Sequence, residues 1–323
     1  MKYVGIHTQQ RRNNARSLFL LCLFPCLVVG LVFLFCFLFV YLSGSYDYES
    51  GNMLAYATAM FVHVAPYAIG AVLIWFLIAY FANTSIINSA TGSRPLERKE
   101  NKRIYNLVEN LCMSQGMRMP KVNIIEDDSL NAFASGINNR TYTVTLSRGI
   151  INKLDDDELE AVIAHELSHI RNHDVRLLIV SIVFVGIFAM MAEIAIRSIY
   201  YSSRSRSRNS KDGGGVIVII LIAALVAAIG YLFSSLMRFA ISRKREYLAD
   251  AGGAEMTKKP WALASALRKI STDSEIEAVT RDDVAQLFIE HPGKHSKGLF
   301  SGFSGLFATH PPIKKRIQIL EQF

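Results

Sequence analysis

Cysteine is scarce in this sequence, with four residues among 323. No two of them form a C-x-x-C pair, so we predict neither a disulfide framework nor a cysteine-based zinc or redox motif. Cys22, Cys26 and Cys36 fall in one apolar run, and Cys112 stands alone. We therefore interpret all four as small apolar packing residues of a protein in a reducing compartment.

Charge is also sparse. Asp, Glu, Lys and Arg make up 19% of the chain, whereas soluble domains carry about 25%. Hydrophobic residues reach 51% and the mean hydropathy is +0.26, which excludes intrinsic disorder and favours a membrane protein. The formal net charge is +8. The basic residues near the apolar runs lack interleaved aromatic residues, so we assign them to membrane orientation and lipid headgroups and predict no nucleic-acid partner.

Four apolar runs, at 18–42, 54–82, 177–196 and 216–237, are each long enough to cross a bilayer, because roughly 20 residues suffice. The first run is longer than the core of a signal peptide and no A-x-A site follows it, so we interpret it as a retained membrane helix. The third run contains one charged residue, Glu193.

The basic residues also predict orientation. The first 17 residues hold four Lys or Arg, the loop at 43–53 holds none, and several follow the second run. The positive-inside rule therefore places the N-terminus and the chain from residue 83 onward in the cytoplasm. The loop between runs three and four is itself basic, with Arg204, Arg206, Arg208 and Lys211. Whether those two runs cross or form a buried pair stays open, but both ends of the pair must share one side.

The segment between the two hydrophobic pairs has the composition of a soluble domain. An amphipathic pattern predicts a helix over 95–117, and β-branched residues predict strands at 122–125 and 140–146. Asp155 and Glu158 form a D-x-x-E capping signal that opens another helix. We expect strand 140–146 to be a sheet edge to which a substrate peptide adds as a further strand.

The capped helix carries His165-Glu166-Leu167-Ser168-His169, an H-E-x-x-H motif. Residues i and i+4 share one helix face, so both imidazoles can reach one metal ion, with Glu166 beside the open position. Catalytic zinc binds three protein ligands and lowers the pKa of water to about 7. A neighbouring carboxylate can then accept a proton as water attacks a carbonyl.

Several residues compete for the third ligand position. His173 continues the i+4 series, but one straight helix cannot wrap three ligands around a metal, and Glu193 lies deep in an apolar run. Glu246 is favoured, because it shares the membrane side of the histidines and lies where run four is expected to continue as a helix. Asp250, one turn further, is placed to hold a ligand histidine. Glu255 and a purely ion-paired role for Glu246 remain alternatives.

Four motifs in this order resemble the HtpX-type membrane zinc proteases, with CAAX prenyl proteases as more distant relatives. They are NAFASG at 131–136, HELSH at 165–169, SRKREYLADAGGAEM at 242–256, and THPP at 309–312 followed by Arg316. The likeness covers the chain from about residue 94 to the end and the paired N-terminal helices. Two departures are visible, namely Leu248 where close relatives often have His, and a longer N-terminus.

The resemblance implies roles for individual residues. His165, His169 and Glu246 would bind one Zn²⁺ per chain and Glu166 would be the catalytic base. The substrate would be contacted by Asn131, Ala132, Phe133 and Ala134. His310 stands either as a donor to the developing oxyanion or as part of a structural turn. Arg316 stands either as a ligand for a substrate carboxylate or, slightly favoured, as a structural partner of Glu321.

We thus expect an α+β, mainly helical, multi-pass protein of the bacterial inner membrane with a cytoplasmic, gluzincin-like zinc protease domain that contains a small sheet. The expected divisions are a basic N-terminus (1–17), a transmembrane hairpin (18–82), a first protease part (83–176), a second hydrophobic hairpin (177–237) and a second protease part (238–323). The expected function is an endopeptidase for misfolded or damaged membrane proteins. The alternatives are a processing protease for a defined substrate, as among the CAAX proteases, and a zinc-binding scaffold, against which the intact Glu166 argues.

Overall fold

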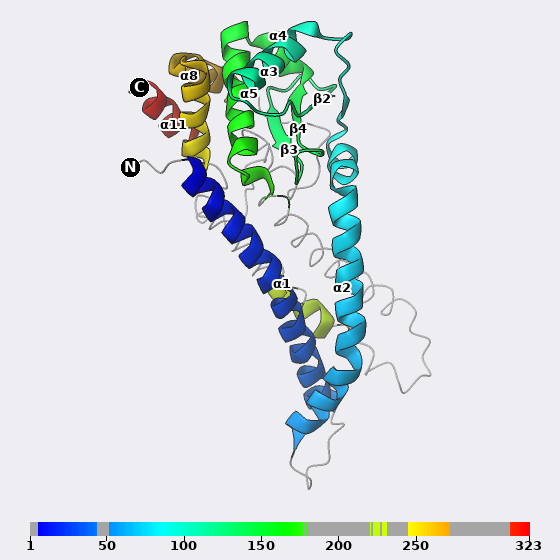
Figure 1. Cartoon of the computed structure of the whole chain (residues 1–323). Coiled ribbons are helices and arrows are strands. Elements are labelled where there is room, and N and C mark those ends of the chain that lie inside the picture. Colours follow the sequence, from blue (N-terminus) through cyan, green and yellow to red (C-terminus); the bar gives the residue numbers. More distant parts are fainter. Residues whose placement is uncertain are drawn as a thin grey trace, which may run out of the picture. The chain divides into compact units, whose positions relative to one another are not determined.

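A computed structural model describes residues 6–43, 52–176, 179, 220, 222–226, 228–230, 245–271 and 311–323 (Figure 1). These residues divide into two units. One unit consists of the described parts of 18–79 and 180–237, and the other of the described parts of 1–17, 80–179 and 238–323.

Two long helices account for the first two apolar runs. Helix α1 spans Ile6–Ser43 and α2 spans Met53–Thr91. Within them, Cys22–Leu42 and Met53–Ile78 are long and apolar enough to cross a membrane. The sequence expectation of two membrane helices here is therefore confirmed as far as length and composition go.

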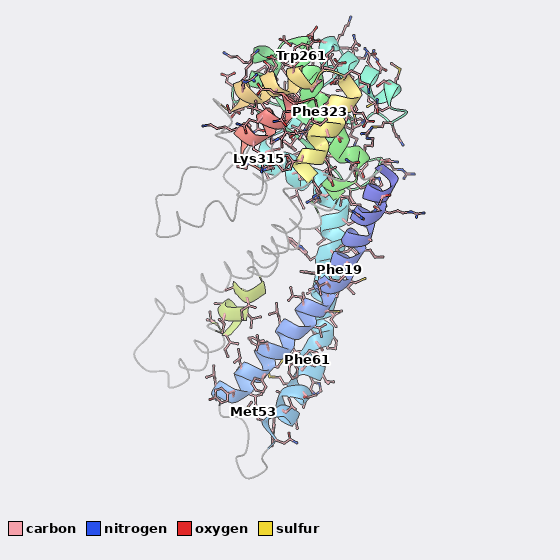
Figure 2. All side chains as sticks on the ribbon, turned by 90° about the vertical axis from the view of Figure 1, so that its left-hand side faces the viewer. Phe19, Met53, Phe61, Trp261, Lys315 and Phe323 are labelled. Atoms are coloured by element: carbon pink, nitrogen blue, oxygen red, sulfur yellow. The ribbon has the colours of Figure 1, made fainter. Side chains whose placement is uncertain are left out.

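One ring contact joins the two helices. Phe33 of α1 meets Phe61 of α2 edge to face, with ring centroids 5.5 Å apart, and Figure 2 labels Phe61. Phe24, Val28, Leu31, Cys36 and Val40 are also buried on α1. Large apolar side chains elsewhere on α2, such as Tyr67 and Leu73, are exposed. A surface of this kind suits contact with lipid, since a soluble protein rarely exposes so large an apolar area.

The third apolar run, which contains Glu193, lies outside the described residues except for residue 179. Of the fourth run the structure describes residue 220 and residues 222–226 and 228–230, and all of them are helical. The four-span topology and the cytoplasmic orientation stay predictions.

The other unit contains a four-stranded mixed sheet in the order β1-β2-β4-β3. The strands are Arg94–Pro95 (β1), Lys121–Ile125 (β2), Ala132–Ser135 (β3) and Thr143–Ser147 (β4). Strand β4 pairs in parallel with β2, with Lys121 opposite Thr143, and antiparallel with β3, with Ala132 opposite Leu146. The prediction that strand 140–146 is an edge is therefore wrong. This strand pairs on both sides, and among the described residues β1 and β3 are the two edge strands.

The sheet is buried by helices of the same unit. These are α3 (Lys102–Ser114), α4 (Arg148–Lys153) and α5 (Asp156–Arg171). Helix α5 runs beside β3, where Phe133, Leu146, Ile163 and Leu167 are all fully buried (Figure 1). Helix α3 is shorter than the predicted 95–117, because Pro95 lies in β1 and Asn101 caps the helix by accepting a hydrogen bond from the Ile104 amide.

Three later segments complete this unit. Residues 245–257 are helical, and α8 (Pro260–Ile270) and α11 (Ile313–Leu320) follow. Helix α8 packs against both α5 and α11. Trp261 and Phe323 remain on the surface of this pair (Figure 2).

Candidate metal centre

A capping box fixes the start of helix α5. The Asp155 carboxylate accepts a hydrogen bond from the Glu158 amide at 2.9 Å, and Glu158 accepts one from the Asp155 amide at 3.1 Å, so the predicted capping box is confirmed. Buried Glu158 also accepts hydrogen bonds from Ser265 and Lys269 of α8 at 2.7 and 2.6 Å. The start of the helix that carries the histidines is thereby fixed to a second helix.

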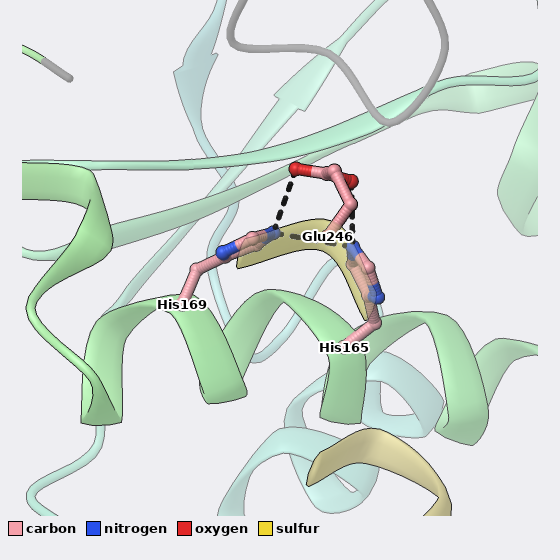
Figure 3. Close-up of side chains that lie close together, drawn as sticks. All are labelled: His165, His169 and Glu246. Atoms are coloured by element: carbon pink, nitrogen blue, oxygen red, sulfur yellow. Dashed lines mark hydrogen bonds and ion pairs between the residues drawn. The ribbon is translucent and has the colours of Figure 1, made fainter. Parts of the chain in front are cut away.

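One turn of α5 and the helix at 245–257 bring three side chains together (Figure 3). His165 Nε2 and His169 Nε2 are 3.2 Å apart. Glu246 places Oε2 3.7 Å from the first nitrogen and Oε1 3.5 Å from the second. His165 and Glu246 are buried, and the side chain of His169 is 14% exposed. The cluster is thus enclosed but retains access at one histidine.

The proton positions on both rings follow from their outer partners. His165 Nδ1 is 3.0 Å from Asp250 Oδ1, and His169 Nδ1 is 3.2 Å from Asp174 Oδ2. A carboxylate only accepts hydrogen bonds, so each Nδ1 is placed to donate to its outer partner, and each Nε2 would offer its lone pair to a bound metal. The two Nε2 atoms and the Glu246 carboxylate therefore converge on a place that favours a cation.

The spacing of these atoms suits a small divalent metal. Ligand atoms about 2.0–2.2 Å from a tetrahedral ion lie roughly 3.3–3.6 Å from one another. The two Nε2 atoms are 3.2 Å apart, each has an oxygen of Glu246 at 3.5 or 3.7 Å, and one ligand atom from each of the three residues can be chosen within 4.8 Å of the others. Two imidazoles and one carboxylate are also the protein ligands of many catalytic zinc sites. The residues present therefore fit a zinc ion with one coordination position left for a further ligand.

The electrostatics of His169 agree with this. Burial lowers the pKa of His169, but the hydrogen bond to Asp174 and the negative charges of Glu246, Asp174 and Glu166 outweigh burial and raise it to about 9. The surroundings therefore favour positive charge at this point, whether a proton or a metal supplies it.

Glu166 lies beside the three ligand side chains and is buried. Burial raises its pKa, the nearby His165 and His169 oppose that effect, and the charge of Glu246 adds to it, so the net shift is upward. The backbone amide of Ala134 in β3 donates a hydrogen bond to the Glu166 carboxylate. A carboxylate with a raised pKa is suited to take up and return a proton near neutral pH.

Each outer carboxylate is held by an arginine. Arg316 of α11 donates to both oxygens of Asp250, at 2.9 and 2.7 Å, and places Nη1 3.5 Å from Glu246. Burial raises the pKa of Asp250, but Arg316 and the hydrogen bond from His165 outweigh it and hold the pKa below its usual value. Arg245 donates to the backbone carbonyl of Asp174 at 3.1 Å and lies 3.8 Å from its carboxylate.

Two glycines permit the close crossing of α5 and the helix at 245–257. A Cβ at Gly252 would lie 2.2 Å from Ser168 Oγ, and one at Gly253 would lie 3.1 Å from the His165 amide nitrogen. Only a residue without a side chain allows the third ligand to approach the histidines this closely.

The other residues singled out from the sequence are distributed as follows. Asn131, Ala132, Phe133 and Ala134 are all buried, backbone and side chain alike, and Phe133 is part of the core, so their role as substrate contacts stays a prediction. Arg316 pairs with Asp250 rather than with Glu321, which pairs with Arg268. The slightly favoured structural role of Arg316 thus has a different partner from the one expected. His310 lies outside the described residues, and its role stays a prediction.

The alternative third ligands point elsewhere. Helix α5 ends at Arg171, and His173 adopts a left-handed conformation (φ 59°) with Nδ1 3.1 Å from the Asn14 side chain. Glu255 forms an ion pair with Arg171 at 3.6 Å. Neither belongs to the group formed by His165, His169 and Glu246.

Sequence reasoning missed Asp174 and Arg245. Asp174 follows His169 by five residues in a segment where the sequence alone indicates only the approach to an apolar run. Arg245 belongs to the basic stretch 243–245, which the sequence suggests only as surface ion-pair partners of Glu246, whereas Arg245 is buried. The sequence feature that could have indicated it is its position directly before the favoured third ligand.

Comparisons with known proteins identify the family of the chain. Residues 98–323 match the model of peptidase family M48. The chain is 71% identical to a "Protease HtpX homolog" of Bacteroides fragilis over the whole of both chains. It is 41% identical to one of Listeria monocytogenes, over 76% of this chain and 82% of that protein. Among solved structures it is similar to Ste24p of S. mikatae, with 20% identity, coverage of 88% of this chain and 61% of the other, and a TM-score of 0.43.

Proposed function

Since this chain belongs to peptidase family M48 and is a membrane-bound metalloprotease, we propose that it is a zinc-dependent endopeptidase whose metal is held by His165, His169 and Glu246. The observation that carries the proposal is the convergence of the two Nε2 atoms, 3.2 Å apart, with the Glu246 carboxylate, whose two oxygens lie 3.5 and 3.7 Å from them. A bound zinc ion supplies a Lewis acid that polarises a peptide carbonyl and acidifies water.

Glu166 then acts as the general base. Its carboxylate accepts a proton from the attacking water and returns it to the nitrogen of the cleaved peptide bond, which a raised pKa favours. Because the Ala134 amide donates to the same carboxylate, β3 and the base keep a constant separation. The hydrogen bond also keeps the carboxylate from turning away from the ligand histidines.

The edge strand β3 is the proposed substrate platform. A peptide in extended conformation would displace whatever buries β3 and add to the side away from β4 by main-chain hydrogen bonds, which makes recognition largely independent of side chains. This mode suits unfolded polypeptides. We therefore propose that the substrates are misfolded or damaged membrane proteins, cleaved on the cytoplasmic side by a chain with four membrane-spanning segments. A processing protease with one defined substrate is the alternative, and it requires a narrow sequence preference.

The proposal is tested with the full chain purified in detergent and an unfolded membrane protein as substrate. We expect cleavage that a chelator abolishes and zinc restores. Glu166→Gln should keep its zinc and lose cleavage, because the base is removed while the ligands remain. Glu160→Gln is the matched control, since Glu160 lies on the same helix and pairs with Lys259. Substantial cleavage by zinc-loaded Glu166→Gln would refute the role of Glu166.

A further inference from the structure

Two residues of the metal centre lie at the ends of one long segment. Asp174 precedes the third apolar run, which begins at residue 177, and Arg245 follows the fourth run, which ends at residue 237. The whole second hydrophobic pair therefore lies between them in the sequence. Both side chains belong to the unit that contains the metal centre.

Asp174 and Arg245 contact each other directly. Arg245 Nη1 donates to the Asp174 backbone carbonyl at 3.1 Å and lies 3.8 Å from Asp174 Oδ1. Asp174 is 4% exposed and Arg245 6%, so water screens this pair little. The hydrogen bond to the backbone fixes the main chain at Asp174 as well as the carboxylate.

One of the two residues contacts a ligand side chain, and the other is next to a ligand in the sequence. Asp174 Oδ2 accepts from His169 Nδ1 at 3.2 Å, and Arg245 directly precedes Glu246. Between α5 and Asp174 the chain turns through His173, whose left-handed backbone sets the direction in which the chain leaves the helix. A displacement of Asp174 or Arg245 therefore alters their contact and, through Asp174, the orientation of His169.

We propose that Asp174 and Arg245 form a clasp that joins the chain before the second hydrophobic pair to the chain after it, and that this contact is coupled to metal binding through His169. In this clasp Arg245 is a positioning residue, because it contacts Asp174 and acts on His169 through it. Opening the clasp releases His169 and weakens the metal site. By thermodynamic reciprocity, metal binding must in turn stabilise the clasp. The inference rests on the proposed function only in requiring that the centre binds zinc.

The test compares Arg245→Met and Arg245→Lys with the full-length wild type in detergent. Arg98→Met is the matched control, because Arg98 forms an exposed ion pair with Glu109 at 2.9 Å. The zinc dissociation constant is measured by competition with a chelator. Hydrogen exchange of the amides at 172–176 is measured with and without zinc.

We expect Arg245→Met to weaken zinc binding about tenfold or more, as loss of a residue that orients a ligand typically does. Arg245→Lys should recover part of that loss, and Arg98→Met should bind as the wild type does. Zinc should slow exchange at 172–176 in the wild type and do so much less in Arg245→Met.

A merely structural role would lower the unfolding temperature of the metal-free protein and leave the zinc dissociation constant of the folded fraction unchanged. That result, or equal protection of 172–176 by zinc in wild type and Arg245→Met, would overturn the clasp. Absence of zinc binding by the wild type would instead refute the proposed function, so the two failures are distinguishable.

Discussion

The two ligand histidines are one helical turn apart, yet their supports differ. Asp250, which holds His165, is bound through both oxygens by Arg316 from the last helix of the chain. Asp174, which holds His169, is only five residues away in the sequence and is held mainly through its backbone carbonyl by Arg245. His165 therefore depends on a distant segment, whereas His169 depends on the local path of the chain after α5.

The two supports therefore differ in how strongly they constrain the histidine that each one holds. A buried arginine with two hydrogen bonds to one carboxylate is strongly constrained, and removing it leaves a buried charge without compensation. Arg245 lies 3.8 Å from the Asp174 carboxylate, a longer contact than the 2.7 and 2.9 Å bonds of Arg316, so it holds this carboxylate less tightly. We infer that the His165 side anchors the metal centre and the His169 side is where its geometry can change.

The largest expected effect comes from breaking the anchored side. Arg316→Met should destabilise the protein by about 3–5 kcal/mol, because Asp250 is left buried and charged. Arg268→Met, which removes an exposed ion pair with Glu321, should change stability by less than about 1 kcal/mol. Denaturant unfolding of the metal-free proteins measures both. Similar stability of the two variants would contradict the anchoring role of Arg316.

A somewhat smaller effect is expected at the close crossing of α5 and the helix at 245–257, on which both histidine supports depend. Gly252→Ala places a methyl group against Ser168 and should destabilise by about 1–3 kcal/mol while weakening zinc binding. Adding Ser168→Ala should relieve part of this loss, because it removes the nearest atom. Zinc titration of the single and double variants tests the contact, and no relief by the second change would place the strain elsewhere.

Replacing each outer carboxylate by its amide compares the sides directly. Asp250→Asn should weaken zinc binding toward the upper end of the roughly 10–100-fold range for such partners, and Asp174→Asn toward the lower end. The reason is that Asp250→Asn also leaves Arg316 buried without its main counter-charge, whereas the bond from Arg245 to the backbone of residue 174 survives. Chelator competition gives both constants, and the reverse order would overturn the comparison.

The smallest effect concerns pH in the metal-free protein. Because the pKa of His169 is raised to about 9, protonated His169 adds stability that is fully present below its unfolded pKa of about 6.5 and is lost as pH rises through about 9. Asp174→Asn should flatten this decline, since the hydrogen bond to Asp174 is the largest of the interactions that raise the pKa of His169. Unfolding midpoints at about pH 6, 7.5 and 9 measure this decline in stability. An unchanged slope in the variant would show that Asp174 does not control this proton.

Much of the fold could be predicted where the controlling interactions are local. The capping box at Asp155 and Glu158 and the amphipathic pattern of α3 act within a few residues, and both appear in the structure. The edge of the sheet could not be predicted in this way. Strand order depends on which strands meet across the sheet, and the sequence pattern of 143–147 is the same for an interior and an edge strand.

By itself, the sequence determined the elements whose physics is periodic or local. These are the two apolar helices of membrane length, the capped helix α5, and the placement of His165 and His169 on one face, which follows from the helical repeat. Only the tertiary structure decided what surrounds these histidines. Arg316 reaches Asp250 across 66 residues and Arg245 reaches Asp174 across 71, and glycines at 252 and 253 let the helices meet. Contacts over such separations depend on how helices cross, and helix crossing is a property of packing in space that no local pattern encodes.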